Sequence, residues 1–363
     1  MPVNDERIAA MNKAWILVAD IGGTNGRFAL VPAEVNGNLY EPMLVASEGH
    51  LENKPMCQQA LTLASKGAPS VLALVQQYLA LIPTDFKIIG ASLALAGPVI
   101  NQQVHLINLG WSACASQLSA ALNMPVLLLN DFVAYANSVP ALDPKQLLTV
   151  RAGEAVTSAP ILVLGPGTGF GAAVLHPMKQ HFVPVGCEAG HICLAATNAE
   201  QDALLLHARR QVSVVNVEYF LSGPGLVRLY QAMAELMLRE AQSGETPINA
   251  IPASLLDSPA AITEAALAGN SVLAIRTLRC FCYWLGQVVS DLVLAHGALG
   301  GVVLCGGILP KIVPLIKQGE FINGVMAKDD VRHYLQPVPI QLALNSDTAL
   351  IGAALWWQQH QLE

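Results

Sequence analysis

Short apolar runs of strand length alternate with longer segments of helical spacing along most of the chain. The short runs predict strands at Trp15–Ala19, Arg27–Leu30, Met43–Ser47, Ile88–Ala96, Val126–Leu129, Ile161–Leu164, Phe170–Leu175, Gly301–Cys305 and Val338–Leu344. The longer segments predict helices at 5–13, Gln58–Leu81, Ala113–Leu122, Asp131–Val139, Gln201–Arg210, from Leu226, Pro259–Ala268, Val272–Ala295, from Pro310 and at Thr348–Gln361. Because nearly continuous apolar strands between helices are typical of sheets covered on both faces, this order predicts an α/β protein.

Two of the predicted strand pairs are joined by turns rich in glycine and threonine. The first turn contains Asp20-Ile-Gly-Gly-Thr-Asn-Gly26, and the second contains Gly165-Pro-Gly-Thr-Gly169. Glycine lets consecutive backbone N–H groups approach an anion closely, Thr24 adds a hydroxyl, and Asp20 can hold a divalent cation carried by a polyphosphate. An ordinary hairpin turn explains either stretch alone. Two such turns indicate two similar domains, each with a phosphate-binding turn.

Polar side chains also stand at three further places. Asn130 and Asp131 follow a buried strand, where ligands of open α/β sheets bind, although an Asp in this position also suits a helix N-cap. Glu188 and His191 follow an expected loop at 184–187 and could bind a metal or a hydroxyl group, but no Cys-x-x-Cys spacing accompanies them. Glu218 lies among apolar residues, which indicates either a partner or an exposed helix position.

Composition narrows the class of partner and the location. The 363 residues suffice for two domains, and 19 basic against 26 acidic residues give a net charge of −7 without any Lys/Arg run, which argues against nucleic acid and anionic membranes. Glycines interrupt Leu292–Leu309, the best candidate for a membrane span, and the first 13 residues lack the apolar core of a signal peptide. With seven scattered cysteines, we expect a soluble, cytoplasmic protein with free thiols.

A polar connection at 140–158 is a candidate domain boundary.

Taken in order, these motifs resemble the bacterial glucokinases of the hexokinase and actin-like ATPase superfamily, in the branch without a zinc motif. The resemblance covers nearly the whole chain and rests on Asp20-Ile-Gly-Gly-Thr-Asn-Gly-Arg27, Asn108-x-x-Trp111, Asn130-Asp-Phe132, Gly165-x-Gly-Thr-Gly169, Glu188-x-Gly-His191, Glu218 with Leu221-Ser-Gly-Pro-Gly225, and Cys305-Gly-Gly-Ile308. The chain departs from the family pattern at Ala189, where glycine is usual, and at Phe170, where leucine is typical.

The resemblance implies a two-domain α/β fold of ribonuclease-H-like topology with a central cleft. Residues 1–140, completed by the C-terminal helix at 345–363, would form the small domain, and residues 141–344 the large one. The implied activity is phosphorylation of glucose at O6 by ATP with Mg²⁺, in a cytoplasmic homodimer, as the first step of glucose use in glycolysis.

The matching motif positions carry over the family's functional residues. Asp131 corresponds to the catalytic base, and the residues that hold glucose correspond to Asn130, Asp131, Glu188, His191 and Glu218. The nucleotide-binding residues correspond to Asp20, Gly22, Gly23, Thr24, Asn25, Arg27, Gly167, Thr168, Gly169, Gly306 and Gly307. Asp20 would also hold Mg²⁺, directly or through water.

Three other functions stay open on sequence alone. A kinase for mannose, fructose or an amino sugar would share the fold and the motifs. A sugar-responsive transcriptional regulator would need a DNA-binding helix-turn-helix, yet only residues 1–14 precede the first predicted strand. An actin-like or chaperone-like ATPase would not need the polar groups at Asn130, Asp131, Glu188, His191 and Glu218, and would release ADP without any sugar.

Overall fold

The computed structural model describes residues 14–33, 58–179, 181–243, 254–344 and 348–361. The chain divides into two compact units: unit 1 contains Met1–Leu147, Phe182–Gly186 and Asn345–Glu363, and unit 2 contains Leu148–His181 and Cys187–Leu344. The helix expected at 5–13 and the strand expected at Met43–Ser47 lie outside the described residues. The domain limits expected at residues 140 and 344 stay predictions.

In unit 1, the described strands form a sheet in the order β3-β2-β1-β4-β8. The strands are β1 (Ala14–Ile21), β2 (Asn25–Pro32), β3 (Gln58–Ala64), β4 (Lys87–Leu95) and β8 (Val126–Asn130). β1, β4 and β8 run parallel, whereas β2 is antiparallel to both β1 and β3. A smaller antiparallel sheet contains β5 (Val99–Ile100), β6 (Gln103–Leu106) and β7 (Trp111–Cys114).

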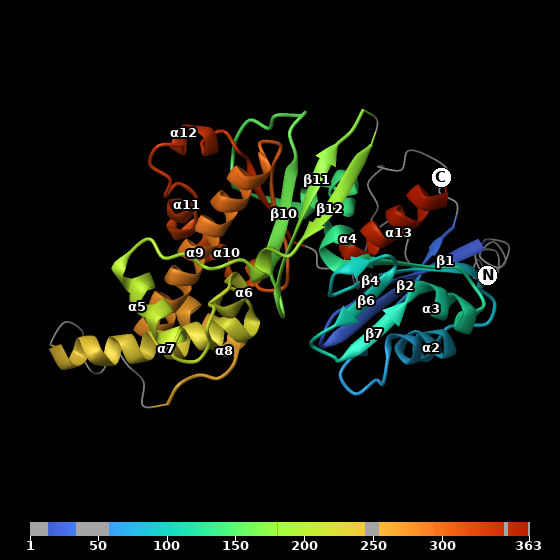
Figure 1. Cartoon of the computed structure of the whole chain (residues 1–363), viewed down its shortest axis with the longest axis horizontal. Helices are drawn as coiled ribbons and strands as arrows, with labels where there is room; N and C mark the ends of the chain where they lie inside the picture. Colours follow the sequence, from blue (N-terminus) through green and yellow to red (C-terminus); the bar gives the residue numbers. More distant parts are fainter. Residues whose placement is uncertain (1–13, 34–57, 180, 244–253, 345–347, 362–363) are drawn as a thin grey trace, which may run out of the picture. The chain divides into compact units, whose positions relative to one another are not determined.

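Helices cover both faces of this sheet because successive residues of its strands point to opposite sides. Trp15 and Leu17 of β1 enter the core that contains α2 (Val71–Leu81) and α3 (Ala115–Leu122). Ile16 and Val18 enter the opposite core, with α4 (Asp131–Ser138) and α13 (Thr348–Gln361). Figure 1 shows α13, in red, on the other side of the blue and cyan strands from α2 and α3.

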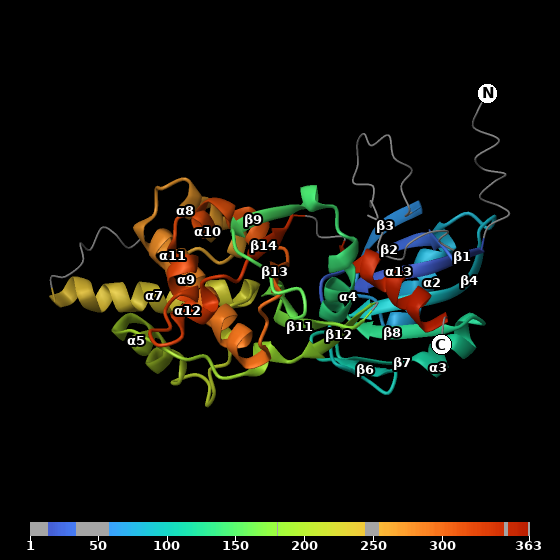
Figure 2. The ribbon, with the colours of Figure 1, turned by 90° about the horizontal axis from the view of Figure 1, so that it is seen from above.

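The C-terminal helix α13 packs very closely on α4, as Figures 1 and 2 both show. A Cβ added at Gly352 of α13 would lie 1.7 Å from the carbonyl oxygen of Ala134, so only glycine permits this crossing. Asn137 donates a hydrogen bond of 3.0 Å from Nδ2 to the carbonyl oxygen of Gly352. Helix α13 is therefore an integral part of unit 1.

The second main sheet repeats the pairing pattern of the first, in the order β12-β11-β10-β13-β14-β9. Its strands are β9 (Leu147–Arg151), β10 (Ile161–Pro166), β11 (Phe170–Pro177), β12 (Phe182–Cys187), β13 (Gly301–Leu304) and β14 (Ile340–Ala343). The β10–β11 hairpin is antiparallel, as β1–β2 is, and β10, β13 and β14 run parallel, as β1, β4 and β8 do. This repeat agrees with the predicted duplicated α/β topology.

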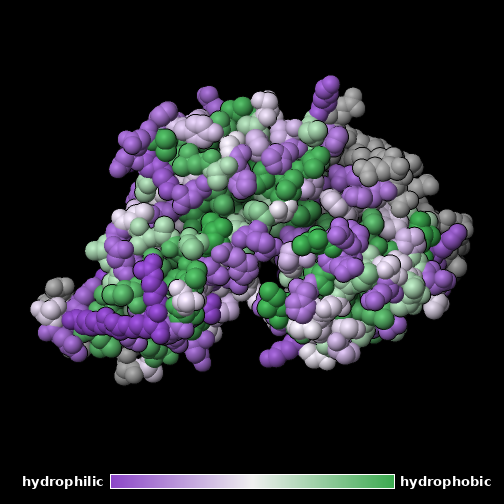
Figure 3. Space-filling model, in the orientation of Figure 1, coloured by the Kyte–Doolittle hydropathy of each residue, from purple (hydrophilic) through white to green (hydrophobic). Residues whose placement is uncertain are grey.

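Most helices of unit 2 surround one long buried helix. The helices are α5 (Ala199–Ala208), α6 (Val217–Phe220), α7 (Gly223–Ser243), α8 (Pro259–Leu267), α9 (Val272–His296), α10 (Val313–Lys317), α11 (Glu320–Val325) and α12 (Arg332–Leu335). Within the described part of the chain, α9 alone is long and apolar enough to cross a membrane, but 72% of that stretch is buried, as in a core helix. The outer side of α7 is hydrophilic in Figure 3.

Three sequence-based assignments were wrong in part. The helix expected from Gln58 is strand β3 up to Ala64, and α2 begins only at Val71, where Ser70 Oγ accepts a hydrogen bond from Ala73 N. Most β3 side chains are exposed, so its sequence lacks a clear strand pattern. The loop expected at 184–187 belongs to β12, which tolerates Pro184 because it is an edge strand of the described sheet. The connection expected at 140–158 contains β9.

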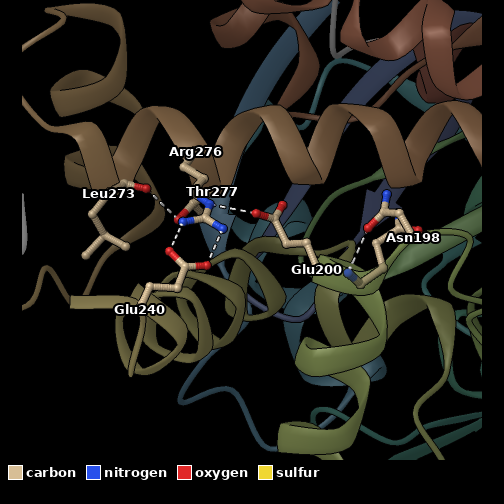
Figure 4. A network of polar contacts seen from close by, with 7 residues as sticks. Asn198, Glu200, Glu240, Leu273, Arg276 and Thr277 are labelled. Atoms are coloured by element: carbon tan, nitrogen blue, oxygen red, sulfur yellow. Dashed lines mark hydrogen bonds and ion pairs between the residues drawn. The ribbon is translucent and has the colours of Figure 1, made fainter. Parts of the chain in front are cut away.

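An arginine on α9 ties two neighbouring helices to the core of unit 2 (Figure 4). Arg276 contacts Glu240 of α7 through both terminal nitrogens, at 2.6 and 2.8 Å, and Glu200 of α5 through Nε, at 2.6 Å. The Glu240 carboxylate is the larger cause that raises the pKa of the guanidinium above its usual range. The three side chains are between 19% and 32% exposed, so solvent weakens these contacts only in part.

We expect Arg276→Gln to destabilise the protein by about 1–3 kcal/mol, because it removes the cation that both carboxylates contact. Urea unfolding, followed by circular dichroism, measures the change. Arg239→Gln is the matched control, since Arg239 and its partner Glu235 are 3.7 Å apart and about half exposed. Equal losses in the two variants would contradict a special role for Arg276.

Candidate active site

The turn between β1 and β2 is tight, and its first amide is used within the turn itself. Gly22 N donates to the carbonyl oxygen of Asn25 at 3.0 Å, and Ser65 N donates to that of Thr24 at 2.9 Å. A Cβ at Gly22 would have only an ordinary contact of 3.6 Å with this Asn25 oxygen, so the turn alone does not require glycine there. The amides of Gly23 and Thr24 are therefore the candidates for contact with a phosphate.

Asp20 and Arg27 stand opposite each other on the two strands below this turn. Their side chains form an ion pair of 3.5 Å, in which Asp20 is 13% and Arg27 36% exposed. A single carboxylate fits Mg²⁺, which binds proteins through one or two carboxylates together with substrate phosphates and water. No group of three or more His, Cys, Asp and Glu gathers into a metal cluster among the described residues. Asp20 therefore fits an ion that arrives with a nucleotide.

Asn130, and not Asp131, is the N-cap of α4. Asn130 Oδ1 accepts hydrogen bonds from Phe132 N at 2.9 Å and Val133 N at 3.2 Å, and its Nδ2 donates to the carbonyl oxygen of Gly97 at 3.1 Å. Asp131 thus occupies the first helical position, half-buried, with Oδ1 accepting from Phe132 N at 2.9 Å. The cap fixes the backbone that carries the Asp131 carboxylate.

The strand register brings Asp20 and Asp131 to the same edge of the unit 1 sheet. Ile21 of β1 lies beside Leu95 of β4, and Leu95 lies beside Asn130 of β8. Because neighbouring strands are about 4.8 Å apart, these two strand ends are separated by about 10 Å. This is the carboxyl edge, where ligands of parallel sheets bind.

The second turn, Gly167-Thr168-Gly169, is also closed by a backbone hydrogen bond within the turn. Gly167 N donates to the carbonyl oxygen of Gly169 at 2.7 Å, and Gly223 N, at the start of α7, donates to that of Gly167 at 2.8 Å. Thr168 is exposed at the tip. Among the described residues, nothing would lie within 4 Å of a Cβ at Gly167.

The glycine pair after β13 lies directly beside the strand that leads into this second turn. Gly306 has a φ of +94°, and a Cβ there would lie 2.5 Å from the carbonyl oxygen of Pro166. Gly307 is exposed, and no described atom would lie within 4 Å of its Cβ. The fold therefore requires glycine at Gly306 but not at Gly307, where a flat ligand can approach the backbone.

Glu188 and His191 come together on a short 3₁₀ turn of unit 2, as their spacing in the sequence predicts. His191 Nε2 lies 3.9 Å from Glu188 Oε2, and both side chains are 54% exposed. Their separation exceeds a hydrogen bond, so a hydroxyl group can bind to both. Cys187, next to them, is half-buried, and this partial burial raises the pKa of its thiol, which disfavours the reactive thiolate.

The immediate partner of Glu218 is the backbone N–H of Phe170, whereas the family resemblance implies a glucose hydroxyl. Its Oε2 accepts a hydrogen bond of 2.8 Å from Phe170 N, and a Cβ at Gly169 would lie 2.4 Å from the same oxygen. Glu218 therefore holds the end of the second glycine turn in place. Its role toward a sugar stays a prediction, with Oε1 as the candidate atom.

Asn216 is a site residue that the sequence reasoning missed. It is the N-cap of α6, which carries Glu218, and its Nδ2 lies 3.3 Å from His191 Nδ1. The sequence contains only a weak signal for it, an Asn just before a short helix. The contact joins residues 25 positions apart, which no local pattern reveals.

The comparisons with known proteins agree over nearly the entire chain. A family model described as Glucokinase matches residues 17–360. A protein named glucokinase from Saccharophagus degradans is 33% identical over 344 residues, which are 94% of this chain and 98% of that protein. The chain belongs to the glucokinase family. The glucokinase of Photorhabdus laumondii is also 33% identical, over 94% of this chain and 97% of its own.

A solved glucokinase structure supports the assignment at the level of the fold. The glucokinase from an Antarctic psychrotroph has a TM-score of 0.73 and 36% identity, and the match covers 95% of this chain and 99% of that one. The two departures from the glucokinase pattern, Phe170 and Ala189, are both buried in the core of unit 2. Their side chains therefore change the packing beneath the site and do not extend into solvent.

Proposed function

We propose that the protein transfers the γ-phosphate of Mg-ATP to the O6 hydroxyl of glucose, which gives glucose 6-phosphate and ADP. The observation that supports this most is the grouping within unit 2 of two phosphate-turn glycines, Gly167 and Gly169, with the hydroxyl-binding groups of Glu188 and His191. Phe170 follows the turn directly and links the two parts, because a Cβ at Gly190, between Glu188 and His191, would lie 2.3 Å from the Phe170 carbonyl oxygen. Family membership gives the reaction its substrate and donor.

In the proposed reaction, Asp131 accepts the proton of O6 as this oxygen attacks the γ-phosphorus of ATP. The bond from O6 to phosphorus forms, the bond from phosphorus to the β,γ-bridging oxygen breaks, and ADP leaves. A general base of this kind contributes about 10²–10⁴ in rate. The amides of the two turns place and neutralise the phosphates, on which phosphoryl transfer mainly depends. Mg²⁺ near Asp20 would neutralise further phosphate charge.

Sugar recognition rests on paired donors and acceptors. A hydroxyl both donates and accepts, so it can donate to the Glu188 carboxylate while it accepts from the His191 ring. A sugar without that hydroxyl, or with it in the other orientation, leaves these groups unpaired. The resulting penalty produces selectivity.

We expect Glu188→Gln to raise the glucose KM about tenfold or more, with the ATP KM changed less than about twofold, because the amide cannot replace a charged acceptor. Steady-state kinetics with each substrate varied measures both constants. Glu235→Gln is the matched control: Glu235 is also 54% exposed and also faces a histidine, His207, at 3.3 Å. An equal rise in both KM values would indicate general damage and contradict the sugar role.

ADP release from Mg-ATP with glucose, mannose, fructose, N-acetylglucosamine and no sugar tests the substrate. The proposal expects release with glucose well above all the others. Release in the absence of sugar would favour an actin-like ATPase instead. We further propose a cytoplasmic homodimer that acts at the first step of glycolysis, supported by the family resemblance; sedimentation would give twice the 38.4 kDa of one chain.

A further inference from the structure

Asn216 has a side-chain amide whose orientation is fixed by the helix that it caps. Asn216 Oδ1 accepts a hydrogen bond of 2.9 Å from Tyr219 N in the first turn of α6. A backbone N–H can only donate, so this atom of the amide must be the oxygen. The NH₂ group therefore points the other way, and it lies 3.3 Å from His191 Nδ1.

The backbone around this contact holds both residues in place. Asn216 forms an isolated antiparallel bridge with Cys193. Two flanking hydrogen bonds, from Leu194 N to Val215 O and from Val217 N to Ile192 O, are both 3.0 Å long. The pairing of the amide with the ring is thus a property of the local fold.

This contact selects one protonation form of the imidazole. An amide NH₂ can only donate, so Nδ1 must accept and cannot carry a hydrogen. In the neutral ring, the hydrogen is then on Nε2, the atom that faces Glu188 Oε2. The ring offers a donor 3.9 Å from a carboxylate acceptor, which is the complement of one hydroxyl group.

We propose that Asn216 is a positioning residue for sugar binding, which holds His191 in the Nε2–H tautomer so that the ring donates to a substrate hydroxyl. The proposal rests on the proposed function for its substrate, but the tautomer itself is a property of the sugar-free protein. Asn216 does not touch the reacting atoms, so we expect it to act on glucose binding and not on phosphoryl transfer.

Two substitutions separate the hydrogen bond to His191 from the cap of α6. Asp and Ser both cap helices well, so Asn216→Asp and Asn216→Ser keep the contact to Tyr219 N. Asn216→Asp replaces the NH₂ donor by an acceptor oxygen, which requires a hydrogen on Nδ1. Asn216→Ser removes the donor without a replacement. Asn198→Asp is the matched control, because Asn198 caps α5 in the same way through Gln201 N.

Proton–nitrogen correlation NMR on histidine rings reads the tautomer directly, with His191 assigned by the signal missing in His191→Gln. The spectra are recorded without sugar, at a pH at which they show a neutral ring. We expect Nε2–H in the wild type and in Asn198→Asp, Nδ1–H in Asn216→Asp, and a mixture in Asn216→Ser. A hydrogen on Nδ1 in the wild type, or on Nε2 alone in Asn216→Asp, would overturn the proposal.

Kinetics at the same pH test the consequence for the sugar. We expect the glucose KM to rise about tenfold in Asn216→Asp and about 2- to 10-fold in Asn216→Ser, with kcat and the ATP KM within about twofold. An unchanged glucose KM in a variant with Nδ1–H would overturn the role in sugar binding. If the wild type phosphorylates no glucose, the proposed function fails, while the spectra still decide the tautomer. Should Asn216→Asp not fold, the spectra and the glucose KM of the wild type and Asn216→Ser decide the same question.

Discussion

Asp131→Asn is expected to lower kcat at least about 100-fold while leaving the binding of glucose nearly unchanged. The amide has almost the shape of the carboxylate, but it cannot accept a proton from O6. The fold should tolerate the change, because the N-cap of α4 is Asn130 and an amide oxygen can still accept from Phe132 N. The loss of a negative charge in the first turn costs only about 0.5 kcal/mol.

Single-turnover kinetics measure the loss of catalytic rate, and calorimetric titration measures the affinity for glucose. Asp143→Asn is the matched control, since Asp143 Oδ1 also accepts a hydrogen bond from a backbone N–H at the start of a short helix of unit 1, that of Lys145 at 2.9 Å. We expect that variant to keep wild-type kcat. If Asp131→Asn kept more than about a tenth of wild-type kcat, Asp131 would not be the general base.

Gly307→Ala is expected to raise the ATP KM about tenfold or more without lowering the melting temperature. Its Cβ would meet no described atom within 4 Å, and its φ lies outside the left-handed region, so the folded chain accommodates it. A bound nucleotide that lies against the backbone would instead meet the new methyl group, and overpacking of this kind costs about 1–3 kcal/mol.

The neighbouring Gly306→Ala should instead lower the stability of the folded protein. Its φ of +94° and the 2.5 Å approach to Pro166 O place the strain in the protein, so we expect a loss of about 1–3 kcal/mol in stability. Thermal unfolding together with nucleotide titration distinguishes the two variants. An unchanged ATP KM in Gly307→Ala would remove Gly307 from the nucleotide site.

The buried strands of both sheets could be predicted from sequence because their apolar runs are short and bounded by turns. β4, β8, β10 and β13 lie within two residues of their expected limits at either end. The sequence pattern wrongly predicts a helix at edge strand β3, because an exposed strand is defined by its hydrogen-bonding partner and not by its own apolar pattern. β3 pairs with β2, which lies far away in the sequence, so the local sequence alone does not reveal this pairing.

The candidate site was predictable to the extent that its motifs are local. Glu188 and His191 are three residues apart, and the structure brings them together. The sequence did not predict three of the contacts: the N-cap of α4 by Asn130, the hydrogen bond from Phe170 N to Glu218, and the contact of Asn216 with His191. The last two depend on chain segments 48 and 25 residues apart, so they arise from the fold.

The proposed reaction moves the γ-phosphate of ATP to O6 of glucose. Phosphorus and carbon NMR of a reaction with ¹³C-labelled glucose and Mg-ATP tests it directly, since it identifies the phosphorylated carbon and counts ADP in the same sample. We expect glucose 6-phosphate and ADP in equal amounts. Phosphate on another oxygen, or ADP that accumulates with inorganic phosphate and unmodified glucose, would contradict it.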